Sequence, residues 1–131
     1  LGEPKRLAAL QAEVAATDRA FSEEAQRIGL GLAFAQYGTA DSMNVGGPDD
    51  AGFVLGAEAI ARMVAQGEPA TSSSARWSSE RTVVASSGDL GLSIGFILVN
   101  VPEGQPERPP IPFFTVWRRA DLASPWRYVA E

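Results

Sequence analysis

The chain has 131 residues, of which 45% are hydrophobic and 21% charged, and its formal net charge is −5 at pH 7. These values are typical of a globular protein with one core, so we expect a single domain over residues 1–131. The negative charge argues against nucleic acid as a partner, because phosphate binding needs a clustered basic surface. No apolar run reaches the length of a membrane span, so we expect no membrane partner.

Histidine and cysteine are both absent from the sequence. Their absence excludes Ser-His-Asp and Cys-His catalysis, histidine-ligated zinc, disulfides and iron–sulfur ligation. We expect neither a metal nor a cofactor, and any acid–base chemistry falls to Asp, Glu, Tyr, Arg or Lys5. Lys5 is the only lysine among 11 basic residues, a bias typical of a bacterial source. The compartment stays open between the cytoplasm and, if a signal peptide preceded Leu1, the periplasm or the exterior.

The first third of the sequence predicts two helices. Apolar residues recur every three or four positions from Leu7 to Ala25, which indicates an amphipathic helix. Acidic residues, Asp18 among them, are expected off this apolar stripe. The glycines at positions 29 and 31 favour a break, and residues 30–37 are predicted to form a second short helix.

The middle of the sequence alternates short elements with turn formers. A short strand is expected at residues 42–45, followed by a loop at 46–52 that is dense in Gly, Pro and Asp. A second short strand at 53–55 and a third helix at 56–65 follow. The polar segment 66–74 connects this helix to the last part of the chain.

From Ala75 onward the apolar period changes to two, which predicts strands. Four are expected, at residues 75–85, 90–99, 113–119 and 126–130. Trp77 is expected to share its strand face with Ser79 and Arg81. In the second of these strands the two faces carry, respectively, Leu90, Leu92, Ile94, Phe96 and Leu98, and Gly91, Ser93, Gly95, Ile97 and Val99.

Several of these strands are apolar on both faces. A sheet covered by helices on one face only should be polar on the other. We therefore expect a homodimer in which a second copy covers the outer face, and we expect a charge at Ile97 or Val99 to weaken it.

Short segments in a fixed order carry a family resemblance. They are Asp18-Arg19-Ala20-Phe21-Ser22, Gly29-Leu30 through Ala33-Phe34 and Tyr37, Asp41, Gly56-Ala57-Glu58-Ala59-Ile60, Trp77, Ser87-Gly88-Asp89-Leu90-Gly91, Val116-Trp117-Arg118-Arg119 and Trp126-Arg127. In this order they resemble the nuclear transport factor 2-like superfamily, specifically its SnoaL-like bacterial branch of domains of unknown function. The resemblance covers nearly the whole chain.

The resemblance implies an α+β fold, a cystatin-like roll. In it a cone-shaped, strongly curved antiparallel sheet packs on three helices from the N-terminal half. The open end of such a cone is usually an apolar pocket. Members of the superfamily include ketosteroid isomerase, limonene epoxide hydrolase, scytalone dehydratase and polyketide cyclases, together with many non-catalytic proteins. The fold therefore does not choose the reaction.

Asp41 is the candidate catalytic carboxylate, since it enters the first strand region. If it faced the pocket, desolvation would raise its pKa and suit it to proton transfer. In the isomerase the general base lies a few positions further on, where this chain has Val45, Gly46 and Gly47. A structural Asp41 would instead accept hydrogen bonds that lower its pKa, and this is the role we expect.

Six aromatic residues are candidates for the lining of the ligand pocket: Phe34, Tyr37, Trp77, Phe96, Trp117 and Tyr128. The same spacing also suits plain core residues. The leading hypothesis is a domain that binds a small apolar or amphipathic molecule, without evident catalysis. One alternative is an isomerase, cyclase or dehydratase that uses Asp41 as acid or base, with Tyr37 or Tyr128 as hydrogen-bond donor. Another is a dimerisation or interaction module whose cone is filled by its own side chains.

Overall fold

The computed structural model describes residues 2–45 and 52–131. The loop expected at 46–52 therefore lies, apart from Gly52, outside the described residues. The elements are α1 (Gly2–Ile28), α2 (Leu30–Tyr37), β1 (Met43–Val45), β2 (Phe53–Leu55), α3 (Ala57–Val64), β3 (Ala75–Val84), β4 (Leu90–Val99), β5 (Ile111–Arg118) and β6 (Arg127–Ala130). None of these helices is long and apolar enough to cross a membrane.

The strands form one curved sheet in the order β2-β1-β6-β5-β4-β3. Neighbours are antiparallel except for β1 and β6, which run parallel, with Met43 opposite Ala130. The sheet is thus mixed rather than wholly antiparallel, because β6, the last strand in the sequence, inserts between β1 and β5. Backbone hydrogen bonds to Met43 (3.1 Å) and Val45 (3.0 Å) extend this pairing to Glu131.

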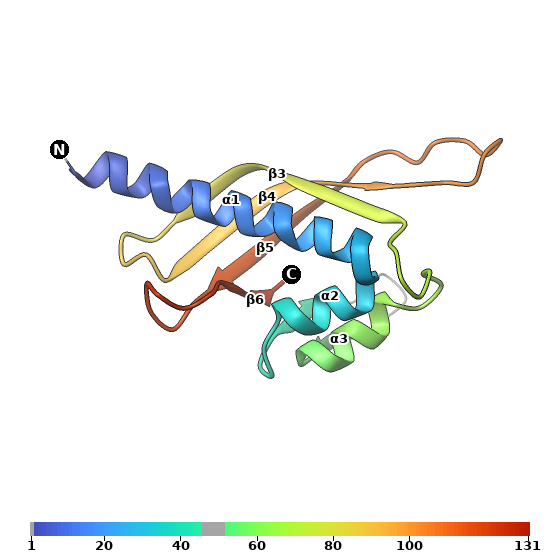
Figure 1. Ribbon diagram of the computed structural model, residues 1–131, viewed down its shortest axis with the longest axis horizontal. Helices are drawn as coiled ribbons and strands as arrows, with labels where there is room; N and C mark the ends of the chain where they lie inside the picture. The colour runs from blue at the N-terminus through green and yellow to red at the C-terminus, as the bar shows by residue number, and fades with distance from the viewer. Residues whose placement is uncertain (1, 46–51) are drawn as a thin grey trace.

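Helix α1 lies along one face of the sheet, and α2 and α3 stack side by side at one end (Figure 1). The apolar stripe of α1 supplies Val14, Phe21 and Ala25, all of which are fully buried. The helix ends at Gly29, whose φ of 106° lies in the left-handed region that glycine tolerates. The turn is tight as well, since a Cβ at Gly29 would lie 2.7 Å from the backbone oxygen of Ala70.

The core is built around the ring of Phe21. Five aromatic rings surround it with centroids 4.8 to 5.9 Å away, in stacked or edge-on contacts. These rings belong to Phe34, Tyr37, Trp77, Trp117 and Tyr128. Aromatic pairs of this kind contribute stability beyond the area that they bury. The cluster ties α1 and α2 to strands β3, β5 and β6.

The alternation expected for β4 is observed, and the one expected for β3 holds only as far as Ser79. On β4 the inner face carries Gly91, Ser93 and Gly95, which are buried. On β3 the register shifts between Ser79, opposite Gly95, and Arg81, opposite Ile94. This bulge adds one residue and turns Arg81 to the outer face, away from the side of Trp77 and Ser79.

Candidate functional site

A cavity of about 380 Å³ opens between the two short helices and the strands of the cone. Its walls are mainly apolar or aromatic and come from α2, α3, β1, β3, β4, β5 and the residue after β6. They comprise Leu30, Phe34, Asn44, Val64, Ala75, Trp77, Ile97, Pro112, Phe113, Phe114 and Glu131. Among these lining residues, Glu131 is the one with an acidic side chain.

Glu131 is held firmly in the cavity wall. Its backbone pairs with β1, and its side-chain Oε1 accepts a hydrogen bond of 3.1 Å from the hydroxyl of Thr115 on β5. Burial raises the pKa of Glu131 to about 8, the nearby Asp18 carboxylate adds to the shift, and the Thr115 bond opposes it. The side chain is therefore mainly protonated in the empty cavity at neutral pH.

Asp18 is a second acid near Glu131 and, unlike Glu131, it is fully buried. It comes from the middle of α1, is 0% exposed, and neither carboxylate oxygen has a hydrogen-bond partner among the described residues. Burial raises the pKa of Asp18 to about 6. The nearby side chains of Ser93 and Trp77 oppose the shift in part, without completing a hydrogen bond of normal geometry. Ser93 itself accepts the indole N–H of Trp117 at 3.1 Å.

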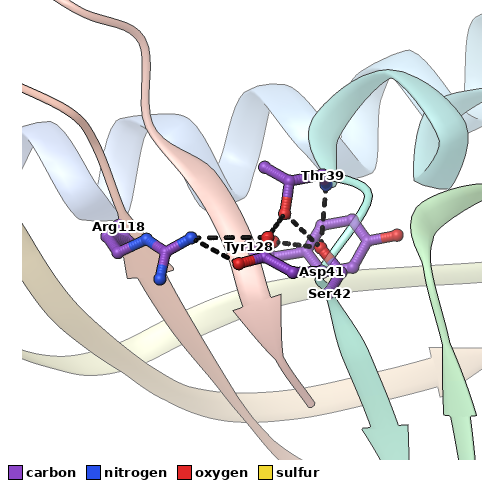
Figure 2. A network of polar contacts seen from close by, with 5 residues as sticks. All are labelled: Thr39, Asp41, Ser42, Arg118 and Tyr128. Atoms are coloured by element: carbon purple, nitrogen blue, oxygen red, sulfur yellow. Dashed lines mark hydrogen bonds and ion pairs between the residues drawn. The ribbon is translucent and has the colours of Figure 1, made fainter.

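Asp41 lies outside the cavity, in the turn between α2 and β1. Its carboxylate is exposed, accepts a hydrogen bond from the hydroxyl of Thr39, and pairs with Arg118 at 3.0 Å (Figure 2). The hydrogen bonds from Thr39 and then Arg118 lower the pKa of Asp41. A desolvated base needs the opposite environment.

The buried polar residue of this turn is Ser42, the neighbour of Asp41. Its hydroxyl donates to the backbone oxygen of Tyr128 at 2.7 Å and accepts the N–H of Thr39 at 2.8 Å (Figure 2). These bonds fasten the turn to β6. Asp41 is left on the outer side of that turn.

The six aromatic candidates divide into three groups. Phe34 and Trp77 line the cavity as well as contacting Phe21, whereas Tyr37, Trp117 and Tyr128 pack around Phe21 and are not among the lining residues. The Tyr128 hydroxyl donates to the backbone oxygen of Phe34 at 2.7 Å, so it is already engaged as a donor. The third group is Phe96, which is 42% exposed on the outer face of β4.

Asp18 and Glu131 were not among the residues selected from the sequence. Asp18 does carry a signal, since it lies four residues after Val14 and three before Phe21, on the buried stripe of α1. Glu131 carries none, because its position depends on β6 entering the middle of the sheet. Within residues 2–45 and 52–131, no three acidic side chains gather in a way that suits a metal ion.

No family model and no curated protein matches the sequence. Three solved structures do match this chain in fold. A designed protein of the nuclear transport factor 2 type has a TM-score of 0.59 and 11% identity, over 91% of both chains. A protein from Thiobacillus denitrificans, described as a calcium/calmodulin-dependent protein kinase type II association domain, has a TM-score of 0.57 and 17% identity. That match covers 93% of this chain and 88% of the other.

A third structure, a SnoaL-like polyketide cyclase from Jannaschia sp. CCS1, has a TM-score of 0.55 and 15% identity. The match covers 92% of this chain and 83% of the cyclase. At these identities the likeness concerns the fold and not the reaction. The chain has the α+β cone fold of the nuclear transport factor 2-like and SnoaL-like proteins, as the sequence resemblance predicted.

Proposed function

We propose that this chain is a small-molecule-binding domain whose ligand occupies the cavity of the cone. The observation that carries the proposal is a space of about 380 Å³ with apolar walls and one acidic residue, Glu131. Binding sites for small molecules typically have volumes of about 300–1,000 Å³, apolar walls and a few polar groups that orient the ligand. The same pattern favours a small apolar or amphipathic ligand.

The cavity also bears on the alternative of a pure interaction module. A cone that served only as a scaffold would be filled by its own side chains, as protein interiors normally are. Here Leu30, Phe34 and Ile97 line an open cavity instead. This argues for a ligand-binding role.

A cavity-filling variant tests the proposal. Ala75 lies in the cavity wall, so Ala75→Leu should remove much of the space and abolish binding of phenethyl alcohol, a neutral aromatic probe. Ala20→Leu, which enlarges an exposed alanine on α1, is the matched control and should leave binding unchanged. Probe-induced amide shifts in the wild-type protein should map to Leu30, Phe34 and Ile97. Shifts scattered over the surface, or equal binding by both variants, would contradict the proposal.

Proton transfer is the second candidate function, and Asp18 rather than Asp41 favours it. A buried acid with a pKa of about 6 exchanges protons near neutral pH, which is the property that a general base requires. The test is exchange of the hydrogens beside the carbonyl of cyclohexenone into heavy water, followed by NMR. Catalysed exchange that disappears in Asp18→Asn would support this function, and exchange no faster than in buffer would oppose it.

We also propose that two copies associate through the outer face of the sheet. This face presents large apolar side chains that are 40% to 54% exposed in the single chain: Val83, Leu90, Ile94, Phe96, Leu98 and Phe114. Cross-strand pairing puts Ile94 opposite Phe114, so the residues form a continuous surface. Exposed apolar surfaces of this kind favour protein–protein contact.

A further inference from the structure

Two acids in the cone, the fully buried Asp18 and the partly buried Glu131, lack a basic partner. Asp18 is fully buried without a hydrogen bond, and Glu131 has only the Thr115 hydroxyl as a side-chain partner. The ion pairs found among the described residues involve neither of these two acids. An uncompensated buried charge is costly, so this part of the cone favours either protonation or the arrival of a cation.

The two basic side chains at the end of β5 are engaged elsewhere. Arg118 pairs with Asp41 at the surface. Arg119, which is buried, donates to the backbone oxygen of Gly88 at 2.9 Å and pairs with Glu13 at 3.3 Å. The cavity lining itself contains no arginine or lysine. Among the described residues no basic side chain pairs with Glu131, so we take a bound molecule as the source of a positive charge there.

The walls around Glu131 suit an organic cation. Phe34, Trp77 and Phe113 contribute aromatic rings to the same cavity. The faces of such rings attract ammonium groups, and the attraction increases where water is excluded. The remaining walls are mainly aliphatic and suit the hydrocarbon part of the molecule, and Asn44 adds a polar amide.

We propose that the ligand of this cavity is a small apolar amine, bound as its ammonium ion with the nitrogen at the Glu131 carboxylate. The inference rests on the proposed ligand-binding function and adds the class of ligand. The ammonium donates to Glu131, while Asp18 stabilises it through space. A carboxylate ligand would be repelled by both acids. A neutral alcohol would not offset their charge.

Phenethylamine and its neutral analogue phenethyl alcohol test the inference by titration calorimetry. Near pH 9 the amine should bind at least about tenfold more tightly than the alcohol, a difference of about 1.4 kcal/mol. Its affinity should rise from about pH 6 to pH 9, because only ionised Glu131 pairs with the ammonium, which itself stays protonated up to about pH 10. At neutral pH, binding should release a proton, so the measured heat should depend on the ionisation enthalpy of the buffer.

Besides burial, the groups that act on the titration of Glu131 are Thr115 from β5 and Asp18 from α1. Burial, and to a smaller extent Glu131, raises the pKa of Tyr128 on β6. Asp18→Asn removes the repulsion between the two acids and should shift the pH profile of amine binding to lower pH. A merely structural role of Asp18 would not move this profile.

Glu131→Gln should lose the preference for the amine, by about tenfold or more, and should keep its affinity for the alcohol. Glu58→Gln removes one exposed acid on α3 and is the control for net charge. If the alcohol binds and the amine binds no more tightly, or if its affinity falls as pH rises, the amine inference is overturned while the ligand-binding function stands. If neither probe binds at millimolar concentration, both are overturned.

Discussion

At the scale of single residues, the most unusual feature of this protein is Asp18. Its ordinary pKa of 3.8 is raised to about 6, since burial penalises the charged form. The folded state therefore holds this proton more tightly than the unfolded state does. Protonated Asp18 therefore contributes its full share to the free energy of unfolding below about pH 4. This contribution is lost as the pH rises through about 6. A shift of about two units corresponds to roughly 3 kcal/mol.

Asp18→Asn should therefore make the protein more stable at pH 7, by roughly 1–3 kcal/mol, and should flatten the fall in stability between about pH 4 and pH 6. Urea unfolding at several pH values measures both effects. Asp121→Asn is the control, because Asp121 is exposed and its pKa is lowered by hydrogen bonds from Ser124 and the backbone of Ala123. That change should remove stability above pH 4 instead. A less stable Asp18→Asn protein at pH 7 would contradict the argument.

Asp41 shows the opposite behaviour at the surface. Its carboxyl carbon should titrate by NMR below the ordinary value of 3.8, because Thr39 and Arg118 stabilise the ionised form. Arg118→Ala should move the titration back up, whereas Arg108→Ala, a change at an exposed arginine of the β4–β5 connection, should not. A value well above 3.8 in the wild-type protein would restore Asp41 as a candidate base.

At the scale of elements, strand pairing depends on a close approach between β3 and β4. A Cβ added at Gly95 would lie 2.0 Å from the backbone oxygen of Ser78, directly before the bulge of β3. Gly95→Ala should destabilise the protein by at least about 2 kcal/mol, because backbone must move to admit the methyl group. Gly91→Ala is the matched control on the same face.

At Gly91 the nearest atom to an added Cβ is the Cγ2 of Val14, at 3.0 Å. That side-chain methyl can yield where a backbone oxygen cannot, so the cost should be smaller. Urea unfolding of both variants, with hydrogen exchange of the β3 amides, measures the difference. Equal losses of stability would show that the approach at Ser78 is not special.

The sequence predicted the elements whose burial pattern is local. The alternation of bulky and small residues along β4 correctly separated its two faces, and the apolar stripe of α1 identified Val14 and Phe21 as core. The bulge of β3 was not predictable in this way, since one extra residue leaves the composition of a strand unchanged and reverses every face after it.

The candidate site was harder to predict than the fold. Asp18 was expected on the polar side of α1 because its side chain is acidic. Its spacing from Val14 and Phe21 instead puts it on the buried side. Glu131 depends on a pairing between β6 and β1, which are about 85 residues apart in the chain. No local pattern reports such a pairing, so the acid in the cavity wall was not identified.

At the scale of the whole molecule, the sheet has two unlike faces. Helix α1 covers the inner face (Figure 1), and the outer face carries a continuous apolar surface. A charge at Ile97 or Val99 was expected to weaken the dimer, but both residues lie on the inner side of β4, and Ile97 lines the cavity. The proposed dimer is therefore tested at two residues of the outer face, Ile94 on β4 and its cross-strand partner Phe114 on β5.

Sedimentation at micromolar concentration should give the wild-type protein the mass of two chains. Ile94→Lys or Phe114→Glu should give one chain that stays folded, because each places a charge at the centre of the apolar surface and both side chains are exposed in the single chain. Leu32→Lys is the control, since Leu32 is 58% exposed on α2, away from the sheet. It should stay dimeric. A monomeric wild-type protein, or Ile94 and Phe114 variants that remain dimeric, would contradict the proposed association through the outer face.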